Sequence, residues 1–243
     1  DRQTDRQTDR QTDRQTDRQT DRQTDRQTDR QTDRQTDRQQ LLNASCKSWE
    51  VKRLGEIANI SSGNSAPQNK MFFDNGIYPF FRTSDVGRIH IGRISKSSDM
   101  LNNDGIKGMT LCKKGTILFP KSGASTFLNH RVIMDVDGFV SSHLATIKAK
   151  ESIILSGYLF QFLKTVDAKE LMQDQNYPSL RLSDISNILI FYPNNINDQQ
   201  KIVAKLDKIS EKTKKLESVY QKKLNNLEEL KKSALYKAFS GGF

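Results

Sequence analysis

The sequence predicts an α+β protein: a compact domain of short strands with one or more helices, followed by one long coiled-coil α-helix. Short runs rich in β-branched and aromatic residues recur between turn signals in residues 49–193. A single clear helical period interrupts them. From Asp198 to about Ser240 the chain holds neither proline nor glycine and keeps a helical period. We therefore expect a repeat at 1–40, a domain at 41–195 and a helical region at 196–243.

The first region is a tetrapeptide repeat, with nine intact copies of DRQT in residues 1–36 and a broken copy, DRQQ, after them. No copy contains an apolar side chain. Nothing offsets the backbone entropy lost on folding, about 1–2 kcal/mol per residue. Known solenoids need a packable unit of some 20 to 50 residues, so a period of four is not one. We expect residues 1–40 to be disordered.

The genetic code offers an origin for this repeat. Tandem GACA reads as GAC-AGA-CAG-ACA, which encodes Asp-Arg-Gln-Thr. Slippage by one unit would shift the frame, so we hypothesise a gene that switches on and off by phase variation. The alternative is a polar linker selected as protein. Because no initiator Met precedes Met71, we also expect sequence upstream of Asp1.

The second region contains six runs that read as strands, separated by breaks such as NNDGIKG. The runs are IYPFFR (77–82), GRIHIGRI (87–94), GTILFP (115–120), RVIMDV (131–136), HLATIKA (143–149) and ISNILIFYP (185–193). One helix is expected over residues 156–172, where apolar residues recur at helical spacing. One helix among many short strands favours a compact α+β domain over a doubly wound sheet.

The third region carries an apolar stripe at alternating steps of four and three residues, typical of a coiled coil. Thr213 and Lys223 interrupt it. The expected helix-pairing residues are Ile202, Leu206, Ile209, Leu216, Tyr220, Leu227, Leu230 and Ala234. A helix of roughly 60 Å with one apolar stripe needs another helix, from a second copy or from a missing part of its own chain. The alternative is a helix that folds back on its own domain.

Charge indicates the class of partner. The repeat holds equal numbers of Asp and Arg, so the whole net charge of +10 lies on residues 41–243. A basic excess of this size suits a polyanion, and nucleic acid before a membrane. The sequence has no signal-peptide core and no apolar run near 18 residues, so we expect a cytoplasmic protein without a membrane partner. Cys46 and Cys112 read as reduced thiols rather than a disulfide.

Catalytic motifs are missing from the sequence. His90, His130 and His143 form no metal-binding pattern, and no glycine-rich phosphate loop is present. No tetrapeptide resembles the NPPY of adenine methyltransferases. The nuclease-like half-motif Glu50-Val51-Lys52 lacks an upstream acid in the region expected to fold. We therefore expect no catalytic residue, no metal site and no bound cofactor.

Nucleic-acid binding finds more support. Four loops place Lys or Arg beside Ser, Thr, Asn or an aromatic residue: 80–88, 111–115, 120–131 and 175–184. Cations contact phosphates, whereas Arg, Asn, Gln and Ser can read base edges. A single basic loop is usually only solvated, but four on a chain without other chemistry favour DNA reading.

These segments resemble the specificity subunits of type I restriction–modification systems. WEVKRLGEIANISSG (49–63) resembles the entry of a target-recognition domain in that family, and KKGTILFPKSG (113–123) its central strand and loop. QNYPSLRLSDISNILIFYPNNINDQQKIVAKLD (175–207) resembles the exit into the family's conserved helical spacer, with its QQ-K-IV signature. LKKSALYKAFSGGF (230–243) resembles the family's chain end.

The resemblance implies that 41–195 is a target-recognition domain reading one half of a bipartite DNA site. The DNA-facing candidates at matching positions are Arg82, Thr83, Ser84, Lys121, Ser122, Gly123, Arg131, Asn176, Tyr177 and Arg181. Lys121 and Arg131 are the phosphate candidates. Arg82, Asn176 and Arg181 are the base-edge candidates.

The implied partners are double-stranded DNA, methyltransferase subunits, restriction/translocase subunits, and a second copy or other half of the specificity subunit. S-adenosylmethionine, ATP and Mg would belong to the partner subunits. Family members usually carry two recognition domains and two helices, whereas this sequence holds one of each. Two alternatives stay open: the recognition tail of a single-chain methyltransferase–nuclease, and a coiled-coil scaffold with no DNA role.

Overall fold

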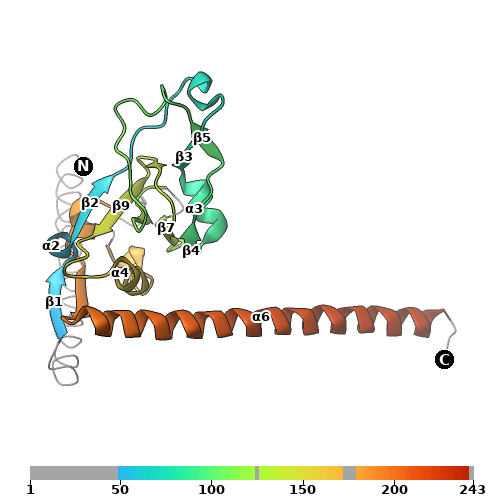
Figure 1. The fold of residues 1–243 in the computed structure, drawn as a ribbon. Helices are drawn as coiled ribbons and strands as arrows, with labels where there is room; N and C mark the ends of the chain where they lie inside the picture. The colour runs from blue at the N-terminus through green and yellow to red at the C-terminus, as the bar shows by residue number, and fades with distance from the viewer. Residues whose placement is uncertain (1–48, 124–125, 172–178, 241–243) are drawn as a thin grey trace, which may run out of the picture. The chain divides into compact units, whose positions relative to one another are not determined.

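The computed structural model describes residues 49–123, 126–171 and 179–240 (Figure 1). The repeat at 1–40 lies outside these ranges. Within them the fold is mixed α and β with a long C-terminal helix, so the predicted class is confirmed. Each of the six expected strand runs contains a strand, shorter than the run itself.

A five-stranded sheet forms the centre of the domain, in the order β2-β9-β6-β7-β4. Its strands are β2 (Ala58–Ser62), β9 (Leu144–Ala149), β6 (Ile117–Pro120), β7 (Arg131–Met134) and β4 (Ile91–Ile94). Neighbours are antiparallel except β7 and β4, which run parallel with Ile91 opposite Arg131. Both faces are covered, so β6 and β7 are buried at every position and are apolar except for Arg131.

The two faces of this sheet belong to two different cores. Ile117, Phe119 and Ile133 point into one core, which packs against α4 (Ser156–Leu163) and β10 (Leu189–Pro193). Leu118 and Val132, one residue along, point into the other core with Phe81 and Val86. The alternation follows from the two-residue period of a strand.

Two smaller sheets complete the strands. β3 (Tyr78–Phe81) lies between β5 (Asp99–Leu101) and β8 (Phe139–Val140), and β1 (Trp49–Arg53) pairs with β10. The sequence analysis did not expect β1, β2, β5 or β8. β8 has only two residues and β5 only three, too few for a periodic signal.

The expected helix over 156–172 is wrong in its extent. α4 ends at Leu163, a turn follows, and a separate 3-10 helix, η3, spans Ala168–Leu171. Two further short helices occupy the flanks of expected strands: α3 (Thr83–Ile89) and α5 (Leu182–Ser186). The remaining short helices are α2 (Leu54–Ile57) and the 3-10 helix η1 (Lys70–Phe73).

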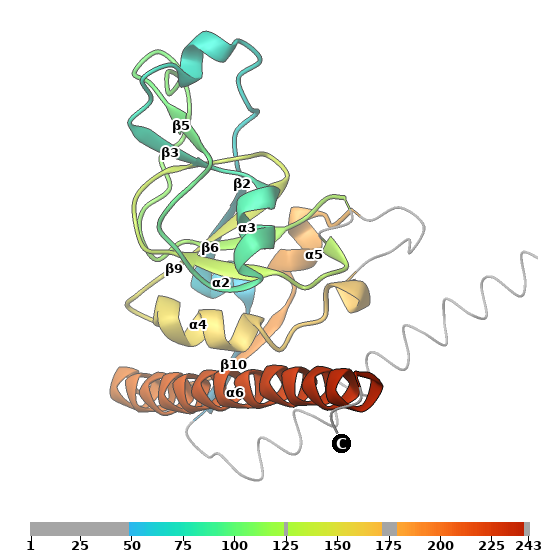
Figure 2. The ribbon, with the colours of Figure 1, turned by 90° about the vertical axis from the view of Figure 1, so that its right-hand side faces the viewer.

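The helix α6 (Ile196–Phe239) is 44 residues long, about 66 Å at 1.5 Å per residue. Among the described residues only its first turns pack on the domain (Figure 1), through Ile202 and Val203 beside α4, which lies above α6 in Figure 2. Gln199, with no exposed surface, anchors it. The Gln199 side chain accepts from the Leu155 amide at 2.9 Å and donates to the carbonyls of Ile153 (3.0 Å) and Pro193 (2.9 Å).

We predict that Gln199→Ala lowers the free energy of unfolding by about 2–4 kcal/mol, because one buried and two partly buried backbone groups lose their partner at once. Gln200, its exposed neighbour, provides the control: Gln200→Ala should stay within about 0.5 kcal/mol of the parent. Urea unfolding followed by circular dichroism measures both. Equal effects of the two substitutions would show that the buried amide does not anchor α6.

Candidate nucleic-acid interface

One end of the five-stranded sheet collects polar loops from distant parts of the chain. β2 and β6 end there, while β9, β7 and β4 begin there, as the strand register requires. The Lys121 amide donates to the His143 carbonyl at 3.1 Å, and the Leu180 amide donates to the Lys121 carbonyl at 2.8 Å. Two of the predicted basic loops, 120–131 and 175–184, therefore meet at this sheet end through their described residues.

The chain turns sharply in the loop that follows β6 and contains Lys121. Gly123 has φ +78° with nothing near its Cβ position, a backbone conformation that glycine adopts without cost. The Ser122 hydroxyl lies 2.8 Å from the His143 Nδ1, and Ser122 also forms an isolated bridge with Ser179. No ion pair of the Lys121 ammonium is recorded among the described residues. The lysine charge is therefore available to an anion.

Arg181 lies near the same sheet end, because the preceding residue, Leu180, is hydrogen-bonded to Lys121. It is exposed and immediately precedes α5, where its amide donates to the Asp184 carboxylate at 3.2 Å. Its guanidinium, like the Lys121 ammonium, has no recorded ion pair in the described part of the chain. Asn176 and Tyr177 lie outside the described residues.

Arg82, Thr83 and Ser84 lie at the start of α3, directly after β3. The Arg82 Nε is committed to an ion pair with the Asp99 carboxylate, and its guanidinium carbon lies 5.2 Å from the centre of the Phe80 ring. About a third of the side chain stays exposed. A base-edge contact by Arg82 would therefore use its two terminal nitrogens, already oriented by Asp99.

The prediction that Arg131 contacts phosphate is wrong. Its side chain has no exposed surface and stacks on Phe119, with the guanidinium carbon 3.4 Å from the ring centre. It donates to the His130 carbonyl at 2.7 Å, and burial lowers the pKa of Arg131 to about 9. The cause is strand alternation: as the first residue of β7, Arg131 shares the core-facing side of Ile133.

The segment 141–143 links the two parts of the candidate interface, and the sequence analysis missed its role. The Ser141 amide donates to the Phe81 carbonyl at 2.9 Å, next to Arg82, and His143 contacts the Lys121 loop. The Asn64 amide donates to the Val140 carbonyl at 2.6 Å. The only sequence signal is the polar SSH directly before a strand.

Other features of the described residues give no sign of a catalytic centre. They contain no group of three or more His, Cys, Asp or Glu side chains that could hold a metal ion. Burial raises the pKa of the Cys112 thiol, which disfavours the reactive thiolate. No described helix is both long and apolar enough to span a membrane.

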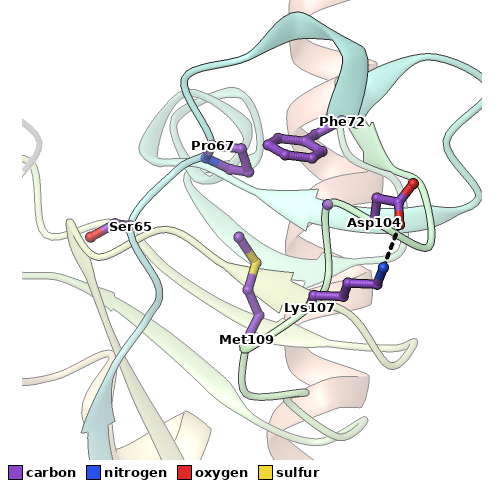
Figure 3. A pocket seen from close by; sticks show the side chains of 7 residues that line it. Ser65, Pro67, Phe72, Asp104, Lys107 and Met109 are labelled. Atoms are coloured by element: carbon purple, nitrogen blue, oxygen red, sulfur yellow. Dashed lines mark ion pairs between the residues drawn. The ribbon is translucent and has the colours of Figure 1, made fainter.

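A shallow hollow of about 510 Å³ lies beside η1 (Figure 3). Phe72, Met109 and Pro67 line it together with Asp104 and Lys107, whose charges pair at 2.7 Å. Because this pair neutralises itself at the surface, the hollow offers no acid–base chemistry.

The expected helix-pairing stripe is exposed along α6 in the single chain. The large members are between 40% and 65% exposed, and Ala234 is exposed too: Leu206, Ile209, Leu216, Tyr220, Leu227 and Leu230. Ile202 differs, since it packs partly against the core of its own domain. Pairing of the stripe with another helix stays a prediction.

Comparison with known proteins points to one family. The family model for the type I restriction modification DNA specificity domain matches residues 46–229. The type I restriction enzyme MjaIX specificity subunit of Methanocaldococcus jannaschii is 29% identical over 189 residues, which cover 76% of this chain and 40% of that protein. This chain therefore spans less than half the length of that relative.

Solved structures share the fold. A chain from a study of complex assembly and conformational transition in the type I R-M system aligns with a TM-score of 0.66 at 21% identity, covering 81% of this chain and 47% of that one. The HsdS subunit of Thermoanaerobacter tengcongensis aligns with a TM-score of 0.58 at 22% identity, covering 81% and 46%.

We predict that Gly63→Ala destabilises the junction between the two parts of the candidate interface by about 1–3 kcal/mol, because the new methyl group would overpack it. That methyl group would lie 2.3 Å from the carbonyl oxygens of both Val140 and Ser141. Gly87→Ala is the control, because its nearest neighbour is 3.9 Å away and alanine favours the helix. Thermal unfolding measures both, and a stable Gly63→Ala variant would contradict the prediction.

Proposed function

Because the chain belongs to the family of type I restriction modification DNA specificity domains, we propose that it recognises one half of a bipartite DNA site. In this proposal it directs methyltransferase and restriction subunits to that site. The observation that carries the proposal beyond family membership is the sheet end where the loops of Lys121 and Arg181 join through the Leu180 amide, with neither cationic side chain in an ion pair among the described residues.

The residues of this sheet end divide into two proposed roles. Lys121 contacts a phosphate, because an ammonium group is a compact point charge without base preference. Arg82 and Arg181 read base edges, for which a planar guanidinium is suited. Thr83, Ser84, Ser122 and Gly123 support these contacts with short polar side chains or close backbone approach.

The chemistry of modification and cleavage is assigned to partners. S-adenosylmethionine, ATP and Mg are proposed to bind the methyltransferase and restriction/translocase subunits, and the chain itself contributes recognition. We further propose that the GACA repeat makes expression phase-variable and that the complex works in the cytoplasm. Loss of methylation at one DNA motif when the frame is off would test the first idea, and unchanged methylation in frame-off cells would contradict it.

We predict that binding of duplex DNA weakens with salt, and that Lys121→Met lowers the slope of log K against log salt by about 1, the value for one phosphate contact. Lys222→Met is the matched control, because Lys222 is an exposed lysine on α6, outside the four basic loops. Fluorescence anisotropy with a random-sequence duplex measures both.

Two outcomes of this experiment would count against the proposal. No binding to any duplex at low salt would favour a coiled-coil scaffold without a DNA role. An equal loss of slope in both variants would show that phosphate contacts are spread over the surface rather than concentrated at the Lys121 end of β6.

We also propose that the stripe on α6 pairs with a second copy of this chain or with the other half of a longer specificity subunit. Four of its residues, Leu206, Leu216, Leu227 and Leu230, expose 40–65% of their surface. Leu216→Glu should abolish self-association seen by light scattering, since burying one unpaired carboxylate costs several kcal/mol. Lys222→Glu, on a polar face, should not. A monomeric parent chain would exclude the second copy.

A further inference from the structure

A pair of histidine side chains joins the end of α3 to the start of β7. His90 ends α3 and His130 directly precedes β7. The His90 Nδ1 lies 2.9 Å from the His130 Nε2, and the rings meet edge to face with their centres 4.6 Å apart. In the neutral pair one ring donates the proton of this bond and the other accepts it.

His130 is buried beside α3, close to Gly87. The ring is 6% exposed, and its Nδ1 lies 3.9 Å from the position where a Cβ of Gly87 would stand. That Nδ1 has no hydrogen-bond partner in the described ranges. The pair is thus a local contact between one helix and one strand end.

The backbone on both sides of this contact is held in a conformation unusual for residues other than glycine. His90 has φ 63° and Asn129 has φ 52°, each at a cost of about 1–3 kcal/mol. Such a conformation persists only where surrounding contacts impose it. The Arg131 amide donates to the His90 carbonyl at 2.9 Å. One backbone hydrogen bond and one side-chain hydrogen bond therefore join the end of α3 to the start of β7.

The other end of α3 carries Arg82, Thr83 and Ser84. The helix has seven residues, about 10 Å, so a shift at its last residue is passed to its first. The Asp85 carboxylate ties the N-terminal end by accepting from the Ser98 amide (3.0 Å) and hydroxyl (2.8 Å). The hydrogen bond of the histidine pair holds the C-terminal end of α3 in the same way.

We propose that His90 and His130 are positioning residues that hold α3, and with it Arg82, Thr83 and Ser84, in the DNA-reading position while both rings are neutral. Protonation of both rings removes the acceptor of the shared hydrogen bond and places two cations in contact. α3 then loses the side-chain hydrogen bond at its C-terminal end, and the ability of the chain to discriminate between DNA sequences falls. This inference rests on the proposed DNA-reading function.

The charged groups around the pair favour its neutral state. Burial lowers the pKa of His130, and the neighbouring His90 and Arg131 lower it further. From the remaining elements, Asp167 in the turn after α4 acts on Arg131, Arg88 on α3 faces Asp85 at 3.6 Å, and Arg93 on β4 pairs with Asp135.

The direction of the pH effect follows from this depressed value. The unfolded chain binds a proton at His130 near pH 6.5, and the folded chain binds it only at lower pH. The stabilising effect of neutral His130 is therefore complete above about pH 6.5 and is lost as pH falls toward the folded value.

The variant His90→Asn/His130→Gln removes the proton sensitivity while keeping an amide hydrogen bond. Asparagine tolerates positive φ better than other side chains, so it suits position 90. His143 is retained in both proteins, so its contribution is common to them. The difference between the two pH profiles therefore reports the pair alone.

The experiment first selects the preferred duplex from a random pool at pH 8 with the full 243-residue chain. It then measures affinity for that duplex and for a scrambled one between pH 7.5 and 5.5. We expect the ratio of the two affinities to fall roughly fivefold in the parent, the equivalent of one neutral hydrogen bond, and to fall less in the variant. Coinciding profiles would overturn the inference and leave the proposed function standing.

A second measurement keeps the inference testable if no duplex is selected, which would itself count against the proposed function. NMR titration of the free parent chain should show the amide signals of residues 83–89 moving in the step in which the second ring of the pair takes up its proton, because a single proton leaves one ring able to accept the hydrogen bond. If the amide signals of α3 do not move in that step, the positioning role of the pair is overturned.

Discussion

Burial of the five-stranded sheet on both faces is the constraint on which the rest of the structure depends. β6 and β7 are buried at every position, because α4 and β10 cover one face while α3 and β3 cover the other. A polar side chain on these strands has no solvent to reach. The chain therefore delivers its polar residues at the strand ends, where Lys121, His143 and Arg181 meet.

Arg131 is the exception that shows the strength of this constraint. As the first residue of β7, Arg131 places its guanidinium in the core, where it stacks on Phe119 and burial lowers its pKa. A displacement of one residue along a strand turns a side chain to the opposite face. Arg131 thus contributes to the packing of β6 against β7, whereas Lys121 lies just outside β6.

The long helix α6 has a first part that packs on the domain and a second part that is exposed. Its first turns are held by three hydrogen bonds of Gln199 and by Ile202 and Val203 against the core. Beyond them the leucines of the stripe lie exposed, a surface that a lone helix cannot bury. The anchor fixes where the helix leaves the domain, and pairing of the stripe with another helix stays a prediction.

The sequence by itself determined the fold class, the family and the presence of the long helix, because uninterrupted heptad spacing and the QQ-K-IV exit are local signals. It also predicted the loops beside Lys121 and Arg181, because those loops are marked by turn residues. Only the tertiary structure decided that Arg131 is buried, that 87–89 end a helix, and that His90 meets His130. Those outcomes depend on which strand ends share an edge and which face each residue occupies. Strand pairing between distant segments sets both, and a two- or three-residue strand such as β8 or β5 leaves no periodic trace in the sequence.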